Sequence, residues 1–258
     1  CIRDRKTAYR SPFLFRNGRV VLACGLGLAL VLVTALLFWQ PKITAIVLAI
    51  LAMIPIGWYL VLRRKEGLDK QKFVPAAPNP TRIADLNARE DYRIQNQITH
   101  LVEIKPGLFR LLTLRFILGA INLLAKTFYN RGNLAGIPSI HFARWVIIDG
   151  GRRLLFFSNF DGSWESYLGD FIDKAAIGLT GVWSNTIGFP PTEKLIFSGA
   201  RNSGDFKAWV REKQLETQVW FSAYKTMSVQ NINNNTQIRK GMIGEMDAEQ
   251  SLAWLQKL

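Results

Sequence analysis

The residues His141–Leu168, HFARWVIIDGGRRLLFFSNFDGSWESYL, carry the clearest structural pattern of the chain. His141–Asp149 and Arg152–Phe160 are rich in β-branched and aromatic residues, and the Gly150-Gly151 pair between them suits a tight hairpin turn. Asp161-Gly162-Ser163 then interrupts the strand pattern, and its serine is typical of a helix N-cap. The stretch therefore predicts a strand, a turn, a second strand and a helix.

Predicted elements on either side of this unit complete an antiparallel sheet. A strand at Ile98–Ile104 and a helix at Leu108–Asn130 precede it. The helix that begins at Ser163 continues to about Asn185 with one apolar stripe, and a further strand is expected at Thr217–Tyr224. This βαββαβ order predicts an α+β domain of ferredoxin-like topology, with helices on one face of the sheet. The other face would be bare, so we expect a second copy, as in dimeric α+β barrels, or the C-terminal helices to cover it.

The remaining segments of this domain carry weaker patterns. They predict a short strand at Lys194–Ser198, a short helix at Gly204–Gln214, a poorly capped helix at Val229–Met242 and a final helix at Asp247–Leu258. The asparagine-rich run Asn231–Asn235 is a weak helix former, and it favours a polar contact surface over a catalytic one.

Two apolar segments, Val20–Trp39 and Ile43–Leu62, precede the domain, and each is twenty residues long without a charged side chain. A helix of that length rises about 30 Å, the thickness of the hydrocarbon core of a bilayer. The Pro41-Lys42 link is short, so we expect a transmembrane helical hairpin rather than two buried helices of a soluble core. The chain thus divides into a basic arm (1–19), the hairpin (20–62), a proline-containing linker (63–97) with one potential short helix around Arg82–Asn87, and the domain (98–258).

The net charge of +14 is concentrated beside the hairpin. Residues 1–19 carry a net charge of +5 and residues 63–72 a net charge of +3, whereas the hairpin loop has only Lys42. By the positive-inside rule, both termini and the domain face the cytoplasm, so we expect a two-span protein of the inner (cytoplasmic) membrane, next to anionic headgroups. No basic motif of a nucleic-acid-binding domain is evident, and nucleic acid is not expected as a partner.

The two cysteines do not indicate a disulfide or a metal site. Cys24 lies inside the first apolar segment, so pairing with Cys1 is not expected, and no metal-ligand spacing occurs. Because the first residue is Cys1 rather than methionine, we expect a trimmed end. A lipidated N-terminal cysteine is the alternative, and it would place the basic N-terminus outside.

The predicted helix Leu108–Asn130 is more apolar than a surface helix of a soluble domain. Three environments would suit it: a covered position in the domain, the membrane interface, or a third membrane crossing. A crossing would bury Arg115 at a cost of roughly 2.5 kcal/mol or more and move the domain outside. We therefore expect an interfacial or covered helix.

Several stretches resemble bacterial proteins related to Dyp-type peroxidases, often labelled peroxidase- or catalase-related. The resemblance covers residues from about 97 to the C-terminus, outside the hairpin, and rests on THLVEIKPG (Thr99–Gly107), IHFARWVIID (Ile140–Asp149), LLFFSNFDGSWESYLGDFIDKA (Leu154–Ala175) and VWSNTIGFP (Val182–Pro190). It implies the ferredoxin-like fold and, as an activity, haem-dependent peroxidase chemistry. Dyp-type peroxidases carry a G-x-x-D-G motif whose aspartate works beside the haem; Asp161 and Gly162 match it, and Ser158 stands at the first glycine.

The candidate catalytic residues are His141, Arg144 and Asp161, and the candidate haem ligands are His141 and His100, the only histidines. A hydrogen-bonded structural histidine is the alternative at both positions. Arg144 alternates with apolar neighbours, so we expect it to be buried with Glu103 or Asp161 as its partner. A structural ion pair is the alternative to an anion clamp there.

A second candidate site is an anion or lipid-headgroup site made of Arg152, Arg153, Gly162 and Ser163. It combines two arginines of the incoming strand with the N-terminus of the following helix. Simple capping of that helix is the alternative reading.

These patterns lead to three hypotheses of function. The first is a non-catalytic, membrane-anchored cytoplasmic interaction or accessory module without a cofactor, which self-associates or joins other subunits of a membrane complex. The second is a haem-dependent, peroxidase-like enzyme. The third is a carrier of a lipid- or quinone-type ligand in a cavity between the sheet and the Leu108–Asn130 helix.

Overall fold

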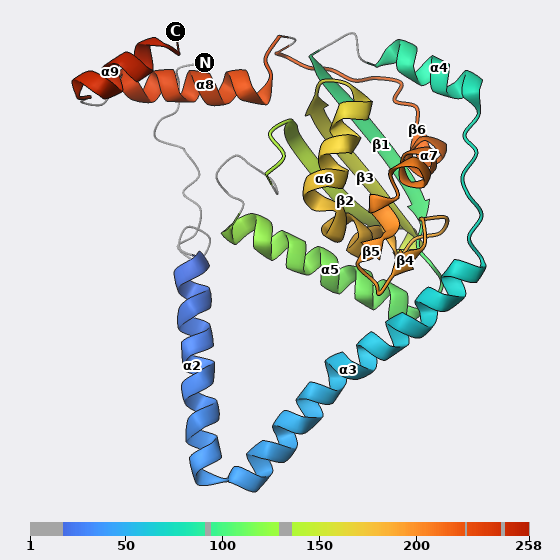
Figure 1. Ribbon diagram of the computed structural model, residues 1–258, viewed down its shortest axis with the longest axis vertical. Helices are drawn as coiled ribbons and strands as arrows, with labels where there is room; N and C mark the ends of the chain where they lie inside the picture. The colour runs from blue at the N-terminus through green and yellow to red at the C-terminus, as the bar shows by residue number, and fades with distance from the viewer. Residues whose placement is uncertain (1–17, 91–93, 129–135, 225, 244–245, 258) are drawn as a thin grey trace.

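Two long helices lead into an α+β domain (Figure 1). The computed structural model describes residues 18–90, 94–128, 136–224, 226–243 and 246–257, with side chains from residue 25 onward. Within these residues the chain forms eight α-helices and a four-stranded antiparallel sheet. Most of the predicted arm 1–19, the end of the helix predicted to reach Asn130, and Leu258 lie outside them.

Helices α2 (Gly18–Trp39) and α3 (Pro41–Gln71) meet at a tight turn and diverge from it (Figure 1). The Thr44 hydroxyl closes this turn by donating to the carbonyls of Leu36 and Gln40, at 3.0 and 2.9 Å. The two predicted helices are confirmed, but α3 runs nine residues past Leu62. The predicted linker therefore begins as helix, because its arginines, lysines and glutamate are good helix formers. Helix α3 is long and apolar enough to cross a membrane, and the other described residues do not bury its apolar part.

The sheet has the order β2-β3-β1-β6, and every neighbouring pair is antiparallel. Its strands are β1 (Gln95–Glu103), β2 (Ile140–Ile148), β3 (Arg153–Asp161) and β6 (Gln214–Leu215). The predicted β2–β3 hairpin is confirmed, and its turn is the short 3₁₀ segment Asp149–Gly151. Gly151 has φ of +94°, a conformation that favours glycine, and a Cβ atom there would lie 2.8 Å from the end of the Leu111 side chain, which would have to shift.

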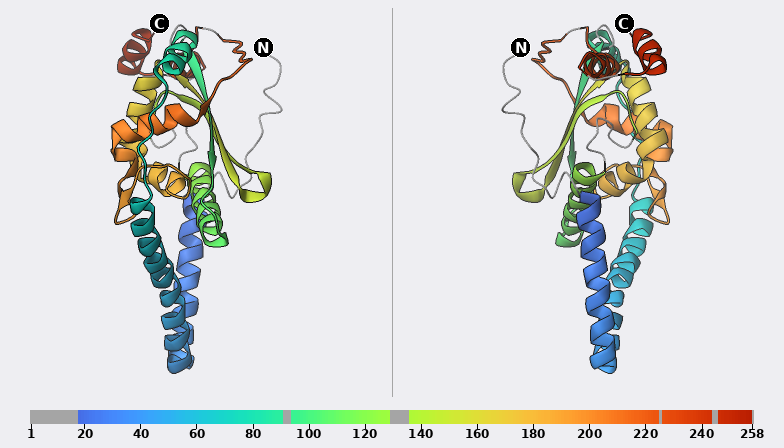
Figure 2. Two further views of the ribbon diagram at one scale, coloured as in Figure 1. Left: turned by 90° about the vertical axis from the view of Figure 1, so that its right-hand side faces the viewer. Right: turned by 90° about the vertical axis from the view of Figure 1, so that its left-hand side faces the viewer.

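Helices α5 (Leu108–Thr127), α6 (Trp164–Trp183) and α7 (Ser203–Lys213) cover one face of the sheet (Figure 2). No helix of the described residues covers the opposite face, which we call the open face. Alternate side chains of β1 and β3 point under the helices and are buried: Ile98, His100, Val102, Leu154, Phe156 and Phe160. The intervening side chains face the open side, where Phe142 of β2 is 71% exposed. This alternation is the burial pattern expected of an antiparallel sheet with one packed face.

The fourth strand is much shorter than predicted. The expected strand Thr217–Tyr224 is wrong: β6 ends at Leu215, and the described residues that follow it up to Tyr224 form neither strand nor helix. Side chains replace the missing backbone ladder, since the Thr217 hydroxyl donates to Gln97 at 2.8 Å and the Ser222 hydroxyl donates to Gln95 at 2.6 Å. The segment 216–224 is thus an extended arm along β1.

The peripheral elements agree with the predictions apart from two details. The helices α4 (Pro80–Arg89), α7, α8 (Val229–Gly241) and α9 (Ala248–Leu255) form where expected. The predicted strand Lys194–Ser198 shrinks to β5 (Phe197–Ser198), which pairs with β4 (Thr192–Glu193) and leads into the 3₁₀ turn Gly199–Arg201. Contrary to the expectation of poor capping, α8 begins with a capping box of Ser228 and Asn231.

A buried ion pair fastens α4 to α7. The Arg211 guanidinium lies 2.8 Å from a Glu90 carboxylate oxygen and 3.7 Å from the centre of the Trp164 ring. Gln214 donates to the other Glu90 oxygen at 2.7 Å, so both charges are fully partnered inside the domain.

Candidate functional site

The structure brings His141 and Asp161 together. His141 is the extra residue of a β-bulge between Ile140 and Phe142, and its Nε2 lies 2.6 Å from Asp161 Oδ1. The other carboxylate oxygen of Asp161 accepts a hydrogen bond from the backbone N–H of Val229 at 2.6 Å. Asp161 therefore joins β2, β3 and the first turn of α8, which is a positioning role that the sequence did not reveal.

Arg144 lies apart from this pair. It is exposed on the open face of β2, where its guanidinium carbon lies 5.2 Å from the centre of the Phe157 ring directly opposite. The expectation of a buried arginine partnered by Glu103 or Asp161 is wrong, because the apolar neighbours of Arg144 lie on the open face as well.

His100 is buried in an aromatic box on the covered face. The rings of Trp183 and Trp209 pack edge-on to it at centroid distances of 6.0 and 4.7 Å, and neither ring nitrogen has a partner among the described residues. Burial, with a smaller contribution from Lys213, lowers the pKa of His100 to about 3. The cavity beside it measures about 20 Å³, room for about one water molecule.

The two candidate haem ligands differ in their surroundings. The cavity beside His100 has room for about one water molecule, whereas His141 uses Nε2 for its contact with Asp161 and keeps Nδ1 for another partner. The two histidines also lie far apart. Across the sheet, His100 of β1 is level with Phe156 of β3 and Trp145 of β2, and Trp145 lies four residues along β2 from His141. The offset along the strands is therefore roughly 13 Å at the usual rise of a strand, and β3 lies between the two strands that carry the histidines.

The four residues of the predicted anion site lie at opposite ends of β3. Arg152 donates to the Asp149 carbonyl at 3.1 Å, and Arg153 pairs with the Asp149 carboxylate, both at the hairpin turn. Gly162 and Ser163 follow the other end of this nine-residue strand, roughly 26 Å away. Ser163 caps α6 by accepting from the Ser166 N–H at 3.1 Å, so this part of the sequence acts as a cap and does not assemble with the arginines.

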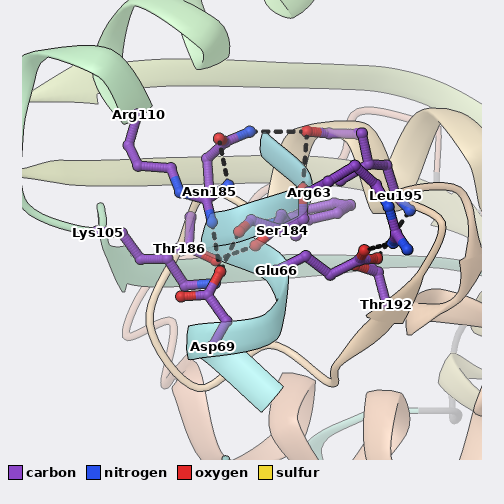
Figure 3. Close-up of polar contacts among 12 residues, drawn as sticks. Arg63, Glu66, Asp69, Lys105, Arg110, Ser184, Asn185, Thr186, Thr192 and Leu195 are labelled. Atoms are coloured by element: carbon purple, nitrogen blue, oxygen red, sulfur yellow. Dashed lines mark hydrogen bonds and ion pairs between the residues drawn. The ribbon is translucent and has the colours of Figure 1, made fainter. Parts of the chain in front are cut away.

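A separate polar cluster joins α3 to the domain (Figure 3). Glu66, whose side chain is 7% exposed, accepts from the Thr192 hydroxyl at 2.6 Å and from the Leu195 N–H at 2.7 Å, and it also pairs with Arg63. This glutamate therefore ties the last turns of α3 to the β4–β5 hairpin.

One turn further along α3, Asp69 binds two cations of the domain through a single oxygen, Oδ2 (Figure 3). Lys105 lies 2.9 Å from that oxygen and also donates to the Ser184 carbonyl at 2.8 Å, while Arg110 approaches it from α5. Burial lowers the pKa of both Lys105 and Arg110 below their ordinary values, and Asp69 opposes that effect. We refer to Arg63, Glu66, Asp69, Lys105 and Arg110 with their partners as the α3 junction.

Sequence reasoning missed the α3 junction because Glu66 and Asp69 lie in a segment taken for a linker. Their spacing of three residues places them on one face of a helix, which would have been a usable signal had the helix been extended beyond Leu62.

A cavity of about 300 Å³ lies between α5, α6 and β2. Apolar side chains make most of its wall, and three charged residues lie at it: Asp173, Lys174 and Arg201. Trp145 also lines it, and the buried indole Nε1 of this residue has no hydrogen-bond acceptor among the described residues. The cavity has the location that the hypothesis of a lipophilic ligand requires.

Comparisons with known proteins assign no family or function to these sites. No protein-family model, curated protein or solved structure matches the chain. In the part of the chain that the structure describes, no three His, Cys, Asp or Glu side chains are grouped so that they could hold a metal ion.

Proposed function

We propose that the chain is a membrane-anchored module that works by contact, with the α2–α3 hairpin in the inner membrane and the domain on its cytoplasmic side. The observation that carries this proposal is the single helix α3, 31 residues long. Its first part is apolar and exposed, and its last turns are fixed to the domain by Glu66 and Asp69. A helix built in this way transmits a fixed orientation from a bilayer to a domain.

Helix α5 supports the same arrangement. It lies across the open end of the V formed by α2 and α3 (Figure 1), and one side of it packs on the domain through Arg110 and Leu114. Its other side exposes Leu108, Leu112 and Phe116, at the four-residue spacing of one helix face. An apolar face of this kind suits the membrane interface, so we place α5 there and not across the membrane.

The partner that best fits the open sheet face is a second copy of the chain. The strand order and the βαββαβ connectivity favour a ferredoxin-like domain, and such sheets can pair face to face. The resemblance of the sequence to Dyp-type peroxidase relatives implies the same fold. The open face and the neighbouring arm expose Phe142, Val219 and Phe221. Exposed charges of both signs lie on the two strands, Arg144 two residues from Phe142 and Glu103 at the far end of β1. A two-fold pairing matches one surface with itself, and confinement to a membrane raises the effective concentration of two copies.

The mass of the full-length chain in mild detergent and in nanodiscs tests this proposal. We expect a dimer, and we expect Phe142→Glu to give a monomer because it places two carboxylates in the paired face. Leu252→Glu on α9, where Leu252 is 65% exposed, is the matched control and should remain dimeric. A wild-type monomer with no retained partner would contradict the proposal, and a complex with other subunits would replace the second copy by one of them.

A second candidate function, a carrier of a lipophilic ligand, is favoured by the cavity beside α5. Its volume lies at the small end of ligand sites, and the Trp145 indole N–H has no acceptor among the residues that the structure describes. Mass spectrometry of organic extracts from the purified protein should then find a bound lipid or quinone that Ala175→Phe, which fills the cavity, removes. An absorption spectrum of the same sample tests the peroxidase alternative, since a Soret band after haem addition would bring that activity forward.

A further inference from the structure

A second cavity, of about 490 Å³, lies against the α3 junction, between the end of α3, residues 72–74, the start of α5 and the loop at 187–189. Its charges are strongly unequal. Four cationic side chains line it, Lys65, Lys72, Lys105 and Arg110, against the one carboxylate of Asp69.

The two buried cations share one partner. Lys105 and Arg110 both contact Oδ2 of Asp69, and their other side-chain hydrogen bonds to described residues go to neutral oxygens of Ser184 and Asn185. A single carboxylate balances only one of two adjacent cations, and an unbalanced buried charge is unfavourable. An anion in the cavity would remove this imbalance.

The other two cations extend the positive charge toward the expected membrane. Lys65 lies three residues beyond Leu62, the end of the apolar stretch of α3, which is about 4.5 Å along a helix. Its ammonium is 5.8 Å from the centre of the Phe109 ring at the start of α5. Lys72 is exposed at the end of α3. The C-terminus of α3 and the N-terminus of α5 both border the cavity. Their helix dipoles have opposite signs, and each corresponds to only about half a charge, so the cationic side chains set the sign of the cavity.

Apolar side chains flank this positive cavity. Leu68 and Val74 line it, and both are exposed, as is Leu108 nearby at the start of α5. Basic pockets beside membrane helices on the cytoplasmic side suit anionic headgroups, whose acyl chains need an apolar neighbour.

We propose that this cavity binds the phosphate group of an anionic phospholipid, with Lys65, Lys72, Lys105 and Arg110 as its ligands and Asp69 as the residue that orients the two buried cations. This inference deepens the proposed function, because it rests on the placement of the α3 junction at the membrane surface. It also moves the headgroup site away from Arg152, Arg153, Gly162 and Ser163.

Short-chain lipids test the site on the full-length chain in an uncharged detergent. Calorimetric titration should show tighter binding of dihexanoyl phosphatidylglycerol than of dihexanoyl phosphatidylcholine or inorganic phosphate. Lys65→Gln/Lys72→Gln removes two cations that lie outside the buried part of the junction, and it should weaken phosphatidylglycerol binding roughly thirtyfold. Arg239→Gln/Lys240→Gln on α8 removes the same charge from a distant exposed surface and should leave binding unchanged.

Three results would overturn the inference. They are equal affinity for the two lipids, equal weakening by the two double variants, and binding of inorganic phosphate as tight as that of phosphatidylglycerol, which would indicate a site for the free anion. Circular dichroism of each variant checks folding. Because micelles contain no bilayer, the titration is independent of membrane insertion, which resistance of the chain to alkaline carbonate extraction tests separately.

Discussion

Replacement of Glu66 by alanine should release α3 from the β4–β5 hairpin. The carboxylate of Glu66 accepts from the Thr192 hydroxyl and the Leu195 N–H, both within 2.7 Å. A hydrogen bond to a charged group contributes about 1.5–3 kcal/mol, and Glu66→Ala leaves both buried donors unpaired. The partly exposed Arg63 adds less than about 1 kcal/mol, because water solvates it. The junction should therefore lose roughly 3 kcal/mol.

Hydrogen exchange followed by mass spectrometry measures this loss locally, because the Leu195 amide is itself one of the donors. A loss of 3 kcal/mol corresponds to about a hundredfold faster exchange for the peptide that covers 192–198. Glu66→Gln is the matched control: it keeps an acceptor oxygen but not the charge, so its effect should be smaller. If the peptide that covers 192–198 exchanges within about threefold of the wild-type rate in Glu66→Ala, Glu66 does not hold the α3 junction together.

Three further predictions concern the domain itself. The pKa of His100 lies near 3 in the folded state, and the unfolded state takes up this proton near pH 6.5; the free energy of unfolding should therefore fall by up to about 1.4 kcal/mol per pH unit as the pH drops from 6.5 toward 3. Denaturant titrations at several pH values should show that His100→Phe removes this part of the slope, and identical slopes would contradict it. Glu90→Ala leaves the Arg211 charge buried without its carboxylate, and thermal unfolding should reveal a loss of roughly 3–5 kcal/mol, whereas a loss below 1 kcal/mol would mean that Arg211 is solvated. Gly151→Ala adds a Cβ at positive φ against Leu111 and should cost about 1–3 kcal/mol in the same assay, with Gly162→Ala, which meets nothing within 4 Å at a similar φ, as the control for packing.

The elements with strong local patterns could be predicted from the sequence. The β2–β3 hairpin follows from its β-branched and aromatic residues around two glycines, and α6 follows from its apolar stripe and the Ser163 cap. The strand expected at Thr217–Tyr224 has the same local composition, but a strand exists only with a neighbour. Its backbone pairs with β1 only just before, at Gln214 and Leu215, and then leaves the sheet edge.

The candidate site was harder to predict because it depends on contacts between distant segments. Glu66 and Thr192 are 126 residues apart, so the helical spacing of Glu66 and Asp69 could place them on one face but could not identify the partners of that face. Arg144 illustrates the opposite error: alternation with apolar residues identified its sheet face correctly, but not that this face is the open one. His141 and Asp161 were singled out, and the bulge that joins them became evident only in the structure.

The α3 junction also bears on how two copies could meet. The open sheet face is turned sideways with respect to the α2–α3 hairpin (Figure 2). If the hairpin stands in a bilayer, a two-fold axis along the membrane normal brings two such faces together without moving either hairpin out of the membrane. Such pairing requires α3 to hold the domain at one angle to the membrane. A flexible connection between α3 and the domain would let the open face take many orientations, and it would lower the effective concentration of the orientation that can pair. Glu66→Ala should therefore weaken self-association although Glu66 lies far from the open face, whereas Phe142→Glu should abolish self-association and leave the exchange of 192–198 unchanged.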